Sequence, residues 1–258
     1  MSWSRARRRA AAALAALLLP PAVLAAIPGA DRIAGAVAEA NDHAGRAGPL
    51  LLRVSLRVAG AGPSAEGELA THPTGLARLE LRSPVGFVER HLLLGDEYRA
   101  SRDGELLDSP HPFLPPIFLL QATSGATLSA ALSSLGVHAQ EVVLGRLGDL
   151  DCYVFGGRLP AAPPDEERLL PSLWIDVTSY DPVRVVGSDG TEYRLGPSQV
   201  YDGIRLPRWI DIQGSRLRAR LEIVSAARAD APAAAFQNEW LTAPVEPVTP
   251  AAGVLPSP

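Results

Sequence analysis

The chain has 258 residues, a formal net charge of −4 and 24 basic residues, every one of them an arginine. The lack of lysine excludes Schiff-base chemistry and a phosphate-loop lysine. The acidic balance argues against nucleic acid as a partner, because phosphate binding needs a basic stripe. The single cysteine, Cys152, cannot form an internal disulfide, and its strand-forming neighbours predict a small buried side chain.

The first 25 residues have the pattern of a cleavable secretory signal peptide. Arg5 and the arginines at 7–9 precede a short apolar run over residues 10–19, and Ala25 and Ala26 offer a cleavage site. The run is too short for a stable membrane span. We therefore expect a mature protein outside the cytoplasm, with a net charge of −8 because four arginines and no acidic residues are removed. The alternative is an uncleaved amphipathic or membrane anchor.

Beyond the signal peptide, the spacing of the apolar residues predicts one helix and then a series of strands. Ile33 and Val37 recur at helical spacing over residues 31–47, with Asp31 as the expected N-cap and Gly45 near the end. Period-two alternation, in which successive side chains point to opposite faces, then predicts strands. They cover residues 50–58, 64–71, 76–81, 87–94 and 97–101.

A segment of different character follows from Leu107 to Gly136. It is rich in proline and in bulky apolar residues, and residues 126–135 have a short helical pattern. Proline at this density cannot lie in central strands, yet the apolar side chains need a dry surface to cover. The sequence therefore predicts a loop-and-helix lid over one opening of the sheet.

The segments after the lid are predicted from the alternation of apolar residues and from the positions of proline and acidic residues. Strands resume over residues 137–144 and 151–155, and residues 158–171 form a solvated loop. The acidic residues of that loop are interpreted as polar surface rather than a metal site: Asp165, Glu166 and Glu167. Near the end of the chain, residues 226–241 are expected to form a helix and residues 242–258 a Pro-rich disordered tail.

Residues 173–224 give the clearest pattern in the chain. Four short runs alternate apolar and polar residues, and turn residues such as Asp189-Gly190 separate them. Asp-Gly between two alternating runs is a strong hairpin signal. The pattern predicts a one-sided antiparallel meander with an apolar inner face and a charged outer face.

Three short motifs in this meander resemble the outer-membrane lipoprotein-sorting family, the periplasmic lipoprotein carriers. They are LWID at residues 173–176, YDPVR at 180–184 and YDGIRLP at 201–207. The order of elements, from the first helix through the lid to the meander, also agrees with that family. The resemblance implies a mainly β fold with a few helices, in one domain over residues 26–241. Its centre would be an incomplete, curved antiparallel β-barrel, a half-barrel, covered by a lid of helix and loop.

The family carries acyl chains or lipid-modified polypeptides across the periplasm without a catalytic step. The resemblance therefore implies a periplasmic carrier that moves a lipid or acylated lipoprotein toward the outer membrane, with inner- and outer-membrane proteins that load and receive the cargo. The alternative is a non-catalytic envelope assembly or structural module, in which the same fold is filled by its own side chains and acts through a protein partner. The sequence carries no signal for an oligomeric state.

The candidate cavity lies between the lid and the first strands. We expect its walls to be apolar side chains from both: Leu52, Val54, Leu56, Leu79 and Leu81 from the strands, and Phe113, Ile117, Phe118 and Leu120 from the lid. Burial of apolar area at about 25 cal/mol per Å² makes an acyl chain a sufficient cargo without specific polar contacts. Ordinary core packing of the same residues is the alternative.

No residue pattern predicts catalysis, a metal or a cofactor. The serines near Ser124 do not form a nucleophile elbow and favour helix capping instead. The histidines have no metal-ligand spacing and are expected at the surface or half buried: His43, His72, His91, His111 and His138. The sequence therefore predicts a protein that is not an enzyme.

Two aspartates of the meander are candidates for a carboxylate pair. Asp176 and Asp211 fall on the outward faces of neighbouring predicted strands, so they do not face each other across a cleft as a glycosidase pair would. A solvated face, or pairing with Arg184 or Arg194, is the expectation for both.

Overall fold

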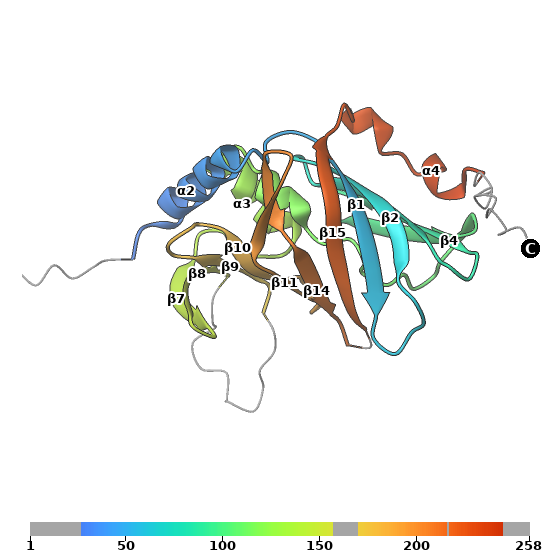
Figure 1. Cartoon of the computed structure of the whole chain (residues 1–258). Helices are drawn as coiled ribbons and strands as arrows, with labels where there is room; N and C mark the ends of the chain where they lie inside the picture. The colour runs from blue at the N-terminus through green and yellow to red at the C-terminus, as the bar shows by residue number, and fades with distance from the viewer. Residues whose placement is uncertain (1–26, 157–169, 216, 245–258) are drawn as a thin grey trace, which may run out of the picture.

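The computed structural model describes residues 27–156, 170–215 and 217–244 (Figure 1). The expected signal peptide, the acidic residues Asp165, Glu166 and Glu167, and the expected tail from residue 245 onward lie outside these residues.

One large antiparallel sheet dominates the described part of the chain. Its strands follow the order β6-β5-β4-β3-β2-β1-β15-β14-β11-β10-β9-β8-β7. Their bounds are β1 (Leu50–Val58), β2 (Ala65–His72), β3 (Leu76–Arg82), β4 (Val88–Leu94), β5 (Glu97–Arg102), β6 (Glu105–Leu106), β7 (Val142–Leu147), β8 (Leu150–Phe155), β9 (Ser172–Asp176), β10 (Pro182–Val186), β11 (Glu192–Leu195), β14 (Trp209–Gln213) and β15 (Arg218–Arg228). Because β6 and β7 at the two ends do not pair, the curved sheet is an open half-barrel, as predicted (Figure 1).

Strand β1 joins the two halves of the sheet. It pairs with β2 on one side and with β15, the last strand, on the other. The register with β15 shifts between Arg53 and Val54, which leaves Val224 as the extra residue of a bulge. A bulge bends its strand and increases the local twist, so the central pair contributes to the curvature.

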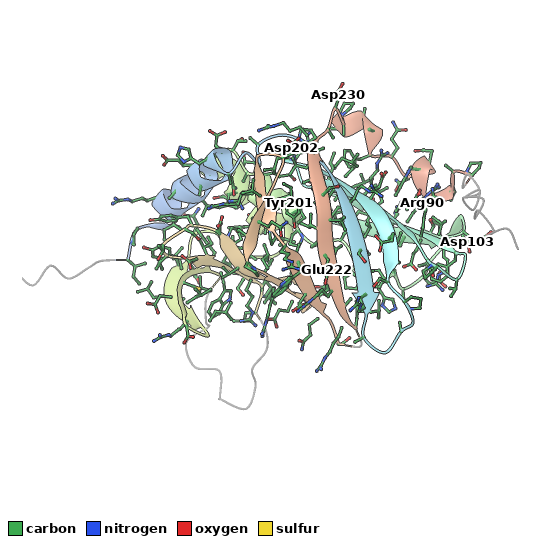
Figure 2. The ribbon with its side chains drawn as sticks, in the orientation of Figure 1. Arg90, Asp103, Tyr201, Asp202, Glu222 and Asp230 are labelled. Carbon is green, nitrogen blue, oxygen red and sulfur yellow. The ribbon has the colours of Figure 1, made fainter. Side chains whose placement is uncertain are left out.

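A separate hairpin packs against the sheet beside β15. It consists of β12 (Ser198–Tyr201) and β13 (Ile204–Pro207). The Tyr201 hydroxyl donates to the carbonyl oxygen of Ile223 in β15 at 2.9 Å (Figure 2). Ile204 and Leu206 are buried in the main apolar cluster, so this hairpin belongs to the core.

Strand alternation divides the sheet into an apolar inner face and a polar outer face. In β1, Leu52, Val54 and Leu56 are buried, whereas Arg53 and Arg57 are exposed. The same alternation in β3, β14 and β15 directs apolar side chains into one continuous cluster that also contains the helices. The predicted period-two pattern is therefore the physical origin of the core.

Three helical segments cover the inner face. They are α2 (Ala30–His43), the 3₁₀ helix η1 (Ile117–Gln121) and α3 (Gly125–Ser134), and α2 and α3 lie side by side (Figure 1). Helix α2 begins after Gly29, so the prediction that Asp31 is the N-cap is wrong. Asp31 lies in the first turn, where its charge is favourable beside the free N–H groups of the helix.

The predicted strand over residues 137–144 begins only at Val142. Val137 ends the turn after α3, because its N–H donates to the carbonyl oxygen of Leu132, and its side chain is buried beneath that helix. The N–H of Glu141 then closes a further turn onto His138. An apolar alternation cannot distinguish such a helix exit from a strand.

The prediction of a helix over residues 226–241 is wrong. Strand β15 continues to Arg228 because β1 offers a free edge, and residues 225–228 pair with residues 50–53. After Pro232 the chain forms two short pieces, η2 (Ala233–Ala235) and α4 (Glu239–Thr242). We call residues 229–244 the C-terminal strap.

The strap covers the outer face of the first strands. Phe236 and Leu241 are buried against Ala70 and Leu92 in a second apolar cluster. Arg90 donates to the carbonyl oxygens of residues 240 and 243, at 2.9 and 2.6 Å, and its guanidinium also lies over the Trp240 ring (Figure 2). The first residues of the expected tail are thus held on the sheet.

Replacing Phe236 with alanine should lower the free energy of unfolding by about 3 kcal/mol, since a buried aromatic anchor of the strap is removed. Urea unfolding followed by circular dichroism measures this change. The exposed Val200→Ala variant is the control and should change stability by less than about 0.5 kcal/mol. Equal stabilities of the Phe236 variant and the wild type would show that the strap is not packed as described.

Candidate functional site

The nine apolar residues predicted to line a cavity are all buried in one cluster. None has more than 5% of its surface exposed: Leu52, Val54, Leu56, Leu79, Leu81, Phe113, Ile117, Phe118 and Leu120. The lid residues and the strand residues therefore meet in the same interior. In this conformation they form a packed core.

A small cavity lies between the lid and the later strands. It is lined by Pro115, Pro116, Ile117, Leu119, Leu120, Pro182, Val185, Tyr193, Leu195 and Ile210. Its water-accessible space is about 10 Å³, which is room for about one water molecule and no acyl chain. Ile117 and Leu120 are the two predicted residues among its walls, and the sheet side is supplied by β10, β11 and β14. The cavity was expected between the lid and the first strands, so the contribution of these late strands differs from the prediction.

The lid, residues 111–122, is not a strand and joins no ladder. Within the described residues, its backbone hydrogen bonds in the turns are internal, such as that from the Leu119 N–H to the Pro116 carbonyl oxygen. Side-chain contacts attach its two ends to the rest of the protein. Its attachment to the protein therefore depends on side chains and not on strand pairing.

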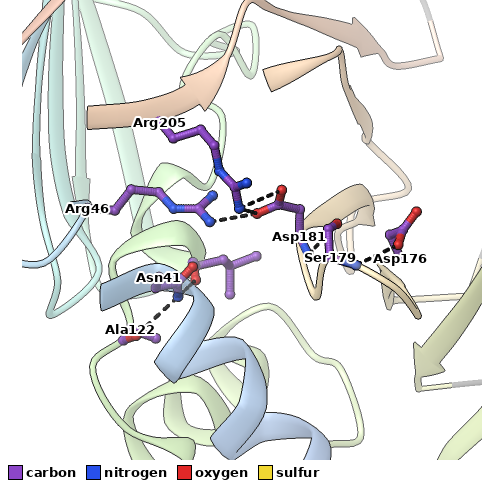
Figure 3. Close-up of polar contacts among 8 residues, drawn as sticks. Asn41, Arg46, Ala122, Asp176, Ser179, Asp181 and Arg205 are labelled. Carbon is purple, nitrogen blue, oxygen red and sulfur yellow. Dashed lines mark hydrogen bonds and ion pairs between the residues drawn. The ribbon is translucent and has the colours of Figure 1, made fainter. Parts of the chain in front are cut away.

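The C-terminal end of the lid is held by α2 and β2. The Asn41 amide donates to the carbonyl oxygens of Leu119 and Ala122, at 3.1 Å each (Figure 3). The Thr71 hydroxyl donates to the Gln121 side-chain oxygen at 2.7 Å, and the Gln121 amide donates to the carbonyl oxygen of residue 48 at 2.8 Å. These groups are buried, so their loss would leave polar atoms unsatisfied.

The N-terminal end of the lid is held by two tyrosines. The Tyr98 hydroxyl donates to the His111 carbonyl oxygen at 2.5 Å and accepts from the Phe113 N–H at 3.1 Å. The Tyr193 hydroxyl donates to the Pro112 carbonyl oxygen at 3.2 Å. Burial raises the pKa of Tyr98 and of Tyr193 well above the ordinary tyrosine value, so both hydroxyls stay protonated and can donate.

The sequence analysis did not identify these lid anchors. Asn41 carried the clearest signal, because it continues the four-residue spacing of Ile33 and Val37 along the buried face of α2. A polar residue at an apolar position of a helix needs a buried hydrogen-bond partner.

A buried polar cluster lies beneath the start of the lid. His91 Nδ1 is 2.8 Å from the Tyr98 hydroxyl, and its Nε2 is 3.0 Å from a Glu89 carboxylate oxygen, although not aligned for a straight hydrogen bond. Arg102 donates to the other Glu89 oxygen at 3.0 Å. Burial alone would raise the pKa of Glu89, but contact with His91 and Arg102 outweighs it, and the pKa lies below its usual range.

The expectation of surface or half-buried histidines is wrong for His91, which is fully buried. Strand β4 is covered on both faces, by the lid inside and by the C-terminal strap outside. When both faces of a strand are covered, its side chains no longer alternate between buried and exposed. The period-two pattern therefore cannot predict which of them are exposed.

The two strongest motifs of the meander meet in an ion cluster. Asp181, from YDPVR, accepts from Arg205, from YDGIRLP, at 3.2 Å. Arg46, just after α2, donates to the same carboxylate at 2.6 Å (Figure 3). Gly45 (φ 70°) lies so close that a Cβ there would be 2.7 Å from the Gly203 carbonyl oxygen. The cluster therefore holds the end of α2 against β13 and the turn before β10.

Of the two alternatives expected for Asp176 and Asp211, pairing with Arg184 or Arg194 is not found, whereas the solvated face fits Asp211, whose side chain is 37% exposed. Asp176 ends β9, and one of its oxygens accepts from the N–H groups of residues 178 and 179, so it closes the following turn. Asp211 pairs with Arg220 on β15. Both Arg184 and Arg194 pair instead with the buried Glu192.

The described residues hold no group of three or more histidine, cysteine, aspartate or glutamate side chains that could bind a metal ion. Cys152 is buried, as predicted, and burial raises the pKa of its thiol. A raised pKa leaves the thiol protonated and unreactive. In the part of the chain that the structure describes, no helix is both long and apolar enough to cross a membrane.

Comparison with known proteins bears on the fold. No protein-family model and no curated protein matches the sequence. A LolA superfamily protein from Nitrosomonas europaea is similar in structure, with a TM-score of 0.50 and 13% identity, over 83% of this chain and 100% of that chain. A DUF1329 family protein from Desulfovibrio piger has a TM-score of 0.46 and 11% identity, over 83% and 100% of the two chains. A domain described as an outer membrane lipoprotein-sorting protein, from Vibrio parahaemolyticus, has a TM-score of 0.42 and 13% identity, over 83% and 99%.

The similarity to the Nitrosomonas protein confirms the predicted resemblance at the level of the fold. The chain shares the overall fold of that protein. At this identity the likeness extends to architecture and not to cargo.

Replacing Asn41 with alanine should lower the free energy of unfolding by about 2 kcal/mol, because two buried carbonyl oxygens of the lid lose their donor. Chemical denaturation measures the change. Glu39→Ala, an exposed site on the same helix, is the matched control and should be near neutral. An Asn41 variant as stable as the control would contradict the role of this residue as a lid anchor.

Stability should also depend on pH through Glu89. Because its pKa is lower in the folded protein than in the unfolded chain, the stabilisation is fully present above the ordinary glutamate range, about 4.3, and is lost as pH falls through the folded-state value. Between about pH 6 and pH 3, the wild type should lose more stability than Glu89→Gln. Denaturation midpoints measured across this range test the prediction, and parallel curves for the two proteins would refute it.

Proposed function

We propose that the protein is a periplasmic carrier that binds the acyl chains of a lipid or lipoprotein beneath the lid and moves them toward the outer membrane. One observation carries the proposal. An apolar lid outside the sheet covers the inner face of a half-barrel, and seven hydrogen bonds that involve side chains attach it at its ends.

Opening the lid costs more than its hydrogen bonds. Seven hydrogen bonds at about 1 kcal/mol each contribute about 7 kcal/mol, and exposure of buried lid side chains such as Ile117 and Leu120 adds to that cost. An acyl chain gains about 0.8 kcal/mol for each methylene it buries, so about ten methylenes offset the hydrogen-bond part alone. A chain that packs against both the sheet and the lid side chains also keeps those side chains out of water. The closed structure is then the unloaded state of the carrier.

The proposal includes no catalytic step. The interior ionisable groups Glu89 and His91 contact each other and lie beneath the lid, fully buried. Periplasmic location rests on the expected signal peptide and on the fold shared with the LolA superfamily protein. Loading and receiving proteins of the two membranes would be the partners.

A second function is favoured by the packed interior. The nine predicted residues form one core, and the cavity has room for about one water molecule. An envelope assembly or structural module would need no larger space and would act through a protein partner. The two functions differ in whether an acyl ligand enters.

The binding of an acyl ligand distinguishes them. We expect purified mature protein, titrated with a fluorescent fatty-acyl probe, to bind it saturably, and solvent extraction followed by mass spectrometry to recover co-purified lipid. Asn41→Ala should bind the probe faster than wild type because its lid opens more easily, whereas Glu39→Ala should match wild type.

Absence of binding by all three proteins, even with lipid in excess, would reject the carrier and leave the assembly module. Binding with the same rate in all three would place the ligand elsewhere than beneath the lid.

A further inference from the structure

Two arginines share one carboxylate where α2, the turn before β10 and β13 meet (Figure 3). Arg46 donates to Asp181 at 2.6 Å, and Arg205 reaches both oxygens of that carboxylate at 3.1 and 3.2 Å. Among the residues that the structure describes, no other carboxylate forms a salt bridge with either arginine. The cluster therefore carries one positive charge in excess.

Part of the hydrogen-bonding capacity of these arginines is unused. The Arg46 side chain is 1% exposed, and its Nε, like the Nε of Arg205, is buried without a hydrogen-bond partner. A guanidinium has five N–H donors, and a buried charged donor without an acceptor is costly. The backbone N–H of Arg205 donates to the Ala44 carbonyl oxygen at 2.8 Å, which ties β13 to the end of α2 but gives neither guanidinium an acceptor.

The pKa of Arg46 reflects the cost of this arrangement. Burial lowers the pKa of the Arg46 guanidinium, and the positive charge of Arg205 lowers it further. The contact with Asp181 raises it, but the net pKa lies below the ordinary arginine value. A second negative charge at this place would balance the two arginines. Arg205 is 40% exposed, so an anion can reach it from outside.

The ion cluster and the cavity beneath the lid are connected through consecutive residues of the chain. Pro182, which directly follows Asp181, lines that cavity together with Leu119 of the lid. The carbonyl oxygen of Leu119 accepts from Asn41, which lies near the end of the same helix that leads into Arg46. The same short segment thus contributes to a cationic cluster and to an apolar space, the two features that an amphiphile with a negative head group requires.

We infer that Arg46 and Arg205 bind the anionic group of an amphiphile whose acyl chain lies beneath the lid. The inference rests on the proposed carrier function and specifies its cargo as an acyl chain that carries a negative charge. A carboxylate or a phosphodiester presents the oxygen acceptors that guanidinium groups recognise.

The test compares ligands with the same chain and different charge, on the full mature protein. Oleate is compared with oleyl alcohol, and phosphatidylglycerol with phosphatidylcholine of the same acyl chains, by displacement of the fluorescent acyl probe. Wild type should prefer the anionic member of at least one pair by about tenfold or more, as expected for a charge-assisted hydrogen-bonded contact. Preference within the first pair identifies a carboxylate, and preference within the second a phosphodiester.

Two variants separate binding from a purely structural role of the cluster. Arg205→Gln should reduce the preference for the anion toward parity, whereas Arg194→Gln, an exposed arginine on the outer face of β11, should keep it. Asp181→Asn removes the competing negative charge and should increase the preference. A cluster that served structure alone would leave the ratio unchanged in all three variants.

Equal affinities of wild type for the charged and uncharged members of both pairs would overturn the inference and leave the carrier proposal intact. A preference that survives Arg205→Gln would also overturn it. Failure of all four ligands to bind wild type would overturn the carrier proposal together with the inference.

Discussion

The inner face of an open sheet has to be kept from water, and most features of this protein serve that requirement. A closed barrel covers its interior with its own strands, but here β6 and β7 remain apart. Helices α2 and α3 and the lid supply the missing wall. The lid belongs to no strand ladder, so burial of its apolar side chains and a few buried hydrogen bonds hold it in place. A cover attached in this way can be replaced by another apolar group.

The ion cluster gives residues of two of the motifs a structural role in this chain. Asp181 and Arg205 come from motifs about twenty residues apart, and Arg46 joins them from the end of α2. Together they fix the helix whose Asn41 holds the lid. In this chain the two motifs therefore supply contacts that position the cover of the sheet. The same contacts leave one arginine charge without a carboxylate partner, and this charge is the group that we propose to bind an anion.

Local patterns in the sequence predict most of the strands, since alternation and turn residues depend on near neighbours. β1 agrees with its predicted bounds because its two faces have different surroundings. Predictions fail where distant segments meet. His91 is buried by the lid and by the C-terminal strap together, and residues 226–228 form a strand because β1 has a free edge. The lid anchors Thr71, Tyr98 and Tyr193 follow from tertiary contacts that no spacing in the sequence encodes.

Hydrogen exchange of the lid with and without an acyl ligand tests the central claim most directly, because it reports local opening separately from global unfolding. With oleate bound, the account predicts that amides of residues 113–122 lose protection while those of β1 and β15 keep theirs, as the chain takes the place of the lid on the sheet. Unchanged or increased protection of residues 113–122 in the presence of a bound ligand would contradict the account, because the lid would then be a fixed part of the core.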